Sequence, residues 1–111
     1  TGLPMYMGEI GHNTMQWQSD FVRVMRENNI GYTFWPYKKI GDSCMNGIPR
    51  PEEWDSVIVK YAETDRSTYK QFREARPDQQ KARQLLMRFV ENARFQNCQP
   101  QREYIKSMGL R

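Results

Sequence analysis

The chain has 111 residues, of which 17 are basic and 13 acidic, so its formal net charge is +4. The basic residues alternate with acidic and apolar ones, and the lack of a block of like charges argues against a nucleic-acid-binding tail. No apolar run approaches the roughly 18 residues of a membrane span, so we expect no membrane partner. The two cysteines and the single histidine lack the spacing of a zinc site, and we expect no cofactor. The two cysteines could pair in an oxidising compartment, but the chain does not resemble a disulfide-dense scaffold, so we expect free thiols.

The first predicted element is a short apolar strand, Met5 to Gly8, which is entered from Pro4 and leads into Gly8-Glu9-Ile10-Gly11. A strand that is apolar throughout suits burial on both faces, as in a parallel sheet. The two glycines allow a sharp turn around the carboxylate.

A helix is predicted next, from about Thr14 to Asn28, with Asn13 as its N-cap and Gln16 completing a capping box. Its predicted buried face carries apolar residues at helical spacing: Trp17, Phe21, Val24 and Met25. A second strand follows, Ile30 to Trp35, rich in aromatic and β-branched residues and ended by Pro36.

The segment from Tyr37 to Arg50 is predicted to be a long loop, a kind of segment that is usually functional when ordered. A helix should open at Pro51, with acidic residues in its first turn and an apolar stripe formed by Trp54, Val57, Ile58 and Tyr61.

The remainder is predicted to be helical and polar. We expect a short helix from Ser67 to Arg76, a long one from Pro77-Asp78 to about Asn97, and a terminal one from Gln101 to Met108. The long helix should bury one side, formed by Ala82, Leu85, Leu86, Phe89, Val90 and Ala93.

The order strand, helix, strand, helix predicts an α/β fold with two short parallel strands and a predominantly helical remainder. A lone pair of parallel strands leaves two sheet edges open, and closure into a barrel is one way to remove such edges. The sequence therefore indicates that part of the sheet is supplied from elsewhere.

Glu9 and Trp35 each stand at the C-terminal end of a predicted strand, where parallel α/β folds hold their active sites. A carboxylate there can attack an anomeric carbon, act as a base or bind a metal, although a surface salt bridge or helix cap is the simpler interpretation. Trp35 can stack on a sugar ring, although core packing is the simpler interpretation.

Residues 4–11, Pro-Met-Tyr-Met-Gly-Glu-Ile-Gly, resemble the nucleophile strand of family five glycoside hydrolases, and Gly31-Tyr32-Thr33-Phe34-Trp35 is similar to their Trp-ended eighth strand. The resemblance covers about residues 3 to 61. It implies that residues 1–64 are the last two β/α units of a (β/α)₈ TIM barrel, with 65–111 as a helical extension packed on the same domain. Such a barrel needs about 250 residues, so this chain would be its C-terminal segment.

The resemblance further implies retaining hydrolysis of a β-1,4-linked glucan, as in a cellulase, with Glu9 as the nucleophile. Trp35, Lys38, Lys39 and His12 would contact the substrate. Ile10 departs from the frequent Phe of the family. The acid/base of the family follows an Asn, and no Asn-Glu pair occurs in this sequence, so the enzyme would be incomplete in this chain.

The implied partners are a β-glucan and the remainder of the barrel, expected on a separate chain, and the implied location is secreted or periplasmic, with any signal peptide upstream. Trp17 and Trp54 are expected in the core, and Asp42 is a weak candidate acid. Two other interpretations stay open: a non-enzymatic helical binding module, supported by the basic pI and the long amphipathic helix, and a carbohydrate-binding fragment that uses Trp35 without catalysis.

Overall fold

The computed structural model describes residues 2–11 and 14–110. The chain divides into two compact units, one formed by Thr1–Ile48 with Cys98–Arg111 and the other by Pro49–Asn97. The boundaries between these units fall at residues 48/49 and 97/98, whereas the sequence predicts a boundary at residue 64. The assignment of residues 1–64 to a barrel stays a prediction.

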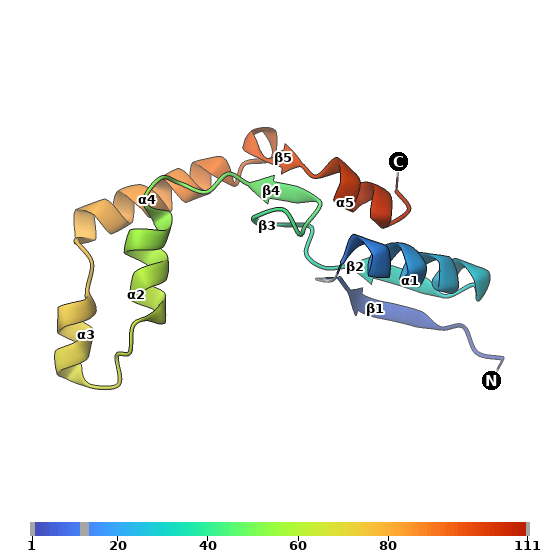
Figure 1. The fold of residues 1–111 in the computed structure, drawn as a ribbon, viewed down its shortest axis with the longest axis horizontal. Helices are drawn as coiled ribbons and strands as arrows, with labels where there is room; N and C mark the ends of the chain where they lie inside the picture. Colours follow the sequence, from blue (N-terminus) through green and yellow to red (C-terminus); the bar gives the residue numbers. More distant parts are fainter. Residues whose placement is uncertain (1, 12–13, 111) are drawn as a thin grey trace. The chain divides into compact units, whose positions relative to one another are not determined.

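The first unit begins with the predicted strand–helix–strand segment (Figure 1). Strands β1, Tyr6–Ile10, and β2, Gly31–Phe34, pair in parallel and are connected through helix α1, Met15–Glu27. Thr14 caps α1, with its side chain accepting a hydrogen bond from the Trp17 backbone N–H. The predicted cap, Asn13, lies outside the described residues. The parallel strand pair is confirmed.

The buried face of α1 differs from the predicted one. Gln18, Val22 and Met25 are buried, whereas Trp17 and Val24 are each about 40% exposed. The prediction that Trp17 is a core residue is therefore wrong; its ring stacks on Phe21 with centroids 5.0 Å apart. The reason is that α1 packs against a second element besides the sheet.

That second element is helix α5, Arg102–Ser107, which brings Tyr104 and Met108 into the core of the unit. Burial of a side chain such as Val22 stabilises the fold by about 1.5–3 kcal/mol. Ser107 Oγ lies 2.6 Å from Gln18 Oε1, which explains why a polar side chain sits on the buried face. The predicted terminal helix is confirmed.

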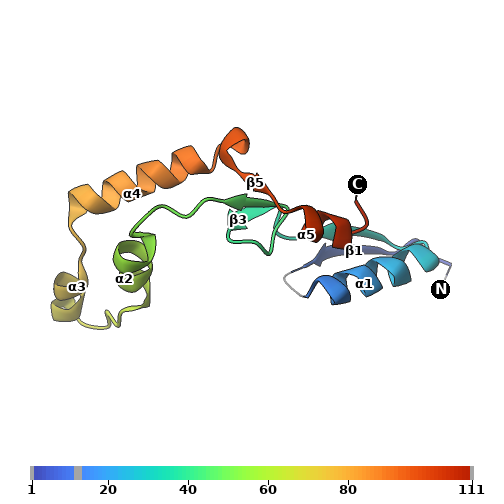
Figure 2. The ribbon, with the colours of Figure 1, turned by 45° about the horizontal axis from the view of Figure 1, so that its top comes forward.

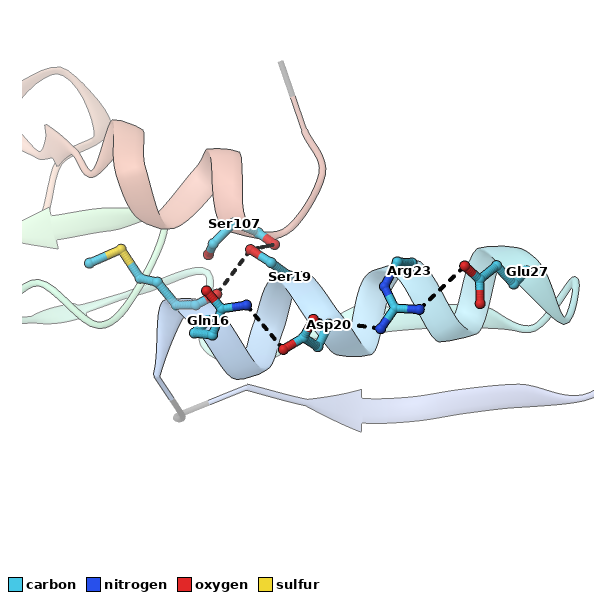
Figure 3. A network of polar contacts seen from close by, with 7 residues as sticks. Gln16, Ser19, Asp20, Arg23, Glu27 and Ser107 are labelled. Carbon is cyan, nitrogen blue, oxygen red and sulfur yellow. Dashed lines mark hydrogen bonds and ion pairs between the residues drawn. The ribbon is translucent and has the colours of Figure 1, made fainter.

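The outer face of α1 carries a chain of polar contacts (Figure 3). Arg23 lies between Asp20 and Glu27, and Gln16 Nε2 donates to Asp20. Ser19 Oγ is 3.4 Å from the Ser107 carbonyl oxygen and so also reaches α5. The ion pairs are exposed, so each contributes little, in the range of about 0–1 kcal/mol.

The segment predicted as a long loop contains two strands instead. Strand β3, Lys38–Ile40, pairs in parallel with β4, Asn46–Ile48, and β4 pairs in antiparallel fashion with β5, Gln99–Pro100. The prediction of a loop from Tyr37 to Arg50 is wrong because β3 and β4 have three residues each, too few to show the alternation of apolar and polar residues that identifies a strand. One of the two partners of β4 also lies about fifty residues away in the sequence.

Two small residues hold this second sheet together. Cys44 is fully buried, and its thiol contacts the carbonyl oxygens of Lys39 and Gly41. A Cβ at Gly47 would lie 2.7 Å from the Gly41 carbonyl oxygen, so glycine permits the close approach of the two segments. Cys44 and Cys98 are both free thiols, as expected.

The second unit begins differently from the prediction. Glu53 has a φ of +62°, and the helix starts only after it, with a wide π-type turn at Asp55–Val59 followed by α2, Lys60–Glu63. Glu53 pairs with Lys81 at 2.6 Å, and Arg50 pairs with Asp55 at 2.7 Å. The acidic residues at 52 and 53 therefore precede the helix rather than occupying its first turn.

Two further helices complete this unit: α3, Tyr69–Ala75, and α4, Gln79–Asn92 (Figure 2). Thr68 forms a capping box with Gln71, and Asp78 caps α4 through the Lys81 N–H. Hydrogen bonds from the Ser67 backbone N–H, which has the largest effect, and from the Ser67 and Gln71 side chains lower the pKa of Asp65.

The long helix, predicted to run to about Asn97, ends at Asn92 and is followed by a short 3₁₀ turn at Phe95–Asn97.

Helix α4 buries less than the sequence predicts. Leu85 is buried and Phe89 packs on Trp54 with ring centroids 5.1 Å apart. Leu86 is 48% exposed and Val90 is 57% exposed, so their predicted burial is wrong within this unit. The apolar arc of α4 is therefore wider than the part of the helix that this unit buries.

Candidate functional site

A β-bulge lies at the predicted nucleophile. Met7 pairs with Tyr32 and Ile10 with Phe34, so two residues of β1, Gly8 and Glu9, stand opposite Thr33 alone. A bulge changes the direction of a side chain and is over-represented next to active sites. Glu9 is exposed on this irregular stretch rather than in the regular ladder.

The ends of β1 and β2 are locked together beside this bulge. The Trp35 backbone N–H donates to the Ile10 carbonyl oxygen at 2.6 Å. A Cβ at Gly11, whose φ is +141°, would lie 1.9 Å from the Trp35 carbonyl oxygen. Only glycine fits there, so the sequence Gly8-Glu9-Ile10-Gly11 brings the Glu9 and Trp35 segments to one end of the sheet.

Trp35 presents an open aromatic surface at that end. It is 63% exposed and is followed by a cis peptide bond to Pro36 and by the half-exposed Tyr37. The interpretation of Trp35 as a core residue is therefore wrong within the described chain. An exposed indole ring can offer its face to a sugar ring, which is the role that the sequence predicts for Trp35.

Sequence reasoning missed two residues near Glu9. The Tyr6 hydroxyl donates to Thr33 Oγ1 at 3.2 Å, and Thr33 Oγ1 in turn donates to the Gly8 carbonyl oxygen. Thr33 therefore bonds to the bulged segment and holds it. Its signal in the sequence, a Thr within an aromatic strand, is too ordinary to reveal this role.

The remaining predicted contacts are less closely grouped. Lys38 and Lys39 lie on β3, the first strand of the other sheet in the same unit, and Lys38 is exposed. His12 lies outside the described residues. Asp42, the weak candidate acid, follows β3 and lines a surface hollow with Ser43.

The described residues, 2–11 and 14–110, contain no cluster of three or more His, Cys, Asp or Glu side chains that could hold a metal ion. Within the same ranges, no helix is both long and apolar enough to cross a bilayer.

Comparison of the chain with protein-family models, with curated proteins and with solved structures gives no match. The resemblance to family five glycoside hydrolases therefore rests on the sequence alone, chiefly on residues 4–11 and 31–35.

Proposed function

We propose that this chain is the C-terminal part of a retaining glycoside hydrolase that acts on β-1,4-linked glucan. In this proposal, β1 and β2 are the last two strands of a (β/α)₈ barrel, and another polypeptide supplies the rest. The observation that carries the proposal is the bulge at Glu9 near the C-terminal end of β1, together with the exposed ring of Trp35 at the same end of β2.

The surface of β1 and of the segment that leads into it supports the need for a partner. Leu3, Met5 and Tyr6 are 75%, 60% and 65% exposed. Within the described residues, strand β1 pairs on one side only, with β2. An exposed apolar strand with an open edge is a liability that proteins normally cover. Neighbouring strands of a barrel would cover both the edge and the apolar side chains.

In the proposed reaction, a Glu9 carboxylate oxygen attacks the anomeric carbon and forms a glycosyl ester while the bond to the leaving oxygen breaks. A second carboxyl group on the partner, about 5–5.5 Å from Glu9, protonates that oxygen. The same group then removes a proton from water, which attacks the anomeric carbon and releases Glu9. Trp35 stacks on a sugar ring, and Lys38, Lys39 and His12 are proposed to contact hydroxyl groups.

The test is reconstitution of the chain with a polypeptide that supplies six β/α units of a family five hydrolase. Glu9→Ala should lower the hydrolysis of a soluble β-1,4-glucan by about 10⁴-fold or more, since it removes a covalent participant. Glu63→Ala, on the exposed side of α2, is the matched control and should leave the rate unchanged. Full activity of the Glu9→Ala assembly would sink the nucleophile assignment.

A helical binding module is the second candidate, and one observation favours it. Leu86, Met87 and Val90 form an exposed apolar stripe on α4, in a chain with a pI of about 9.2. Binding to nucleic acid would weaken steeply with salt, because phosphate contacts release counterions. Glycan binding through Trp35 should change little between low and physiological salt.

A further inference from the structure

Helix α1 covers one face of the β1–β2 pair, the face that carries Tyr32 and Phe34. The Phe21 ring of α1 meets the Tyr32 ring edge-on, with centroids 6.4 Å apart, and both strand residues are half-buried. Met7 and Ile10 are the partners of these two residues in β1. Residues paired across neighbouring strands share a face of the sheet, so Met7 and Ile10 both belong to the face that α1 covers.

The bulge decides that Ile10, and not Glu9, occupies this covered face. Alternate residues of a regular strand share a face, so a strand without the bulge would place Glu9 on the same face as Met7. The extra residue moves that position on by one, to Ile10, which is only 8% exposed. Glu9 is exposed instead. The environment of the proposed nucleophile therefore depends on the bulge.

The other face of the strand pair carries the side chains that bond to the bulge. Gly31 and Thr33 alternate with Tyr32 and are exposed. A Cβ at Gly31 would lie 2.8 Å from the Tyr6 ring, so this glycine lets the ring lie across β2. The Tyr6 hydroxyl then reaches Thr33 Oγ1 and donates to it at 3.2 Å. Helices form the outer ring of a (β/α)₈ barrel, so in the proposed barrel this face is the inner one.

Thr33 is the single residue of β2 that stands opposite the bulge, and its hydroxyl bonds to the bulged segment. Thr33 Oγ1 donates to the Gly8 carbonyl oxygen. Because a bulge disrupts the ladder locally, this side-chain bond ties β2 to the segment where the backbone pairing is irregular. A hydroxyl has one proton and two lone pairs, so Thr33 can donate to Gly8 and accept from Tyr6 at the same time.

We propose that Thr33 is a positioning residue for Glu9. The Gly8 carbonyl belongs to the peptide group that leads into Glu9, so the Thr33 hydroxyl fixes the backbone from which the nucleophile projects. This inference rests on the proposed function. Attack on the anomeric carbon needs reacting atoms about 3–3.5 Å apart, and a displacement of about 1 Å can lower the rate about hundredfold.

The test is Thr33→Val in the reconstituted protein, a substitution that keeps the β-branched shape and removes the hydroxyl. The kcat for a soluble β-1,4-glucan should fall about tenfold to hundredfold, because Glu9 loses its fixed backbone. The KM should stay the same, because the contacts to the sugar remain. Thr33→Ser keeps the hydroxyl and should restore most of the lost kcat.

Thr64→Val is the matched control. The Thr64 hydroxyl also donates to a backbone carbonyl oxygen, that of Lys60, at 2.6 Å, but it lies in the second unit at the end of α2. The same substitution there removes the same kind of bond without acting on Glu9. It should leave both kcat and KM unchanged.

A second measurement uses the ¹⁵N-labelled 111-residue chain by itself and does not depend on activity. Thr33→Val should shift the backbone amide resonances of Gly8 and Glu9, and Thr33→Ser should return them toward their original positions. Thr64→Val should leave both resonances in place. Unchanged Gly8 and Glu9 amides in the Thr33→Val chain would show that the hydroxyl does not hold the bulge, and the inference would be overturned.

Failure of the inference and failure of the proposed function give different results. Full activity of Glu9→Ala overturns the proposed function and the positioning role with it. An inactive Glu9→Ala protein together with an unchanged kcat for Thr33→Val leaves the proposed function standing and overturns the positioning role. An equal loss of kcat in Thr33→Val and Thr33→Ser also overturns it, because the effect then comes from packing and not from the hydroxyl.

Discussion

At the scale of the residue, glycine decides how closely the two strand ends approach. Gly11 has a positive φ and lies against the Trp35 backbone, whereas a Cβ at Gly8 would meet no atom within 4 Å. Two glycines that flank the same glutamate therefore have different roles. One permits the contact between the strands, and the other lies in the bulge with open space around it.

This difference gives a matched pair of substitutions. Gly11→Ala should lower the free energy of unfolding by about 2 kcal/mol or more, because the new Cβ displaces the Trp35 carbonyl and strains the backbone. Gly8→Ala should change it by about 0.5 kcal/mol or less. Urea unfolding followed by tryptophan fluorescence measures both, and equal effects of the two substitutions would contradict the close-approach argument.

At the scale of the element, helices α1, α3 and α4 begin where a side chain caps them, whereas α2 and α5 have no such cap. Thr14, Thr68 and Asp78 each accept a hydrogen bond from a backbone N–H in the first turn that follows. Helix α3 depends most on its cap, because it is only seven residues long and buries no residue fully. Short helices with little packing are marginal in water.

Thr68→Ala should therefore destabilise α3 by about 1 kcal/mol, through loss of the capping box. Amide hydrogen exchange in residues 69–75 should become severalfold faster while exchange in α1 stays the same. Lys70→Ala, which removes only an exposed ion pair of 3.9 Å, is the control and should change exchange little. Unchanged exchange in the Thr68→Ala chain would show that packing, not capping, holds α3.

The success of sequence reasoning also varied by element. Strands β1 and β2 and helices α1, α3, α4 and α5 were predicted, and all but α5 have either a clear apolar pattern or a capping residue. The three short strands β3, β4 and β5 were not. The pairing of β4 with β5 joins segments far apart in the sequence, and the buried Asn46 and Gly47 look like loop residues.

At the scale of the whole molecule, the positions of Glu9 and Trp35 could be predicted from their strands, but the local geometry could not. The bulge at Gly8-Glu9 depends on the register of β1 against β2, and the Thr33 contact depends on the same register. The surface hollow lined by Asp42 and Tyr104 could not be predicted from the sequence either, because it joins residues more than sixty positions apart. Pairings of this kind arise only when the chain is folded.

The central claim is that Glu9 forms a covalent bond to the sugar, and trapping tests it most directly. The reconstituted protein is incubated with a 2-deoxy-2-fluoro cellobioside that carries a good leaving group, so that the glycosyl-enzyme accumulates. Peptide mass spectrometry should then find one fluorinated cellobiosyl group on the peptide that contains Glu9, and none after Glu9→Gln. A label on a different carboxylate, or active protein that acquires no label, would contradict the account.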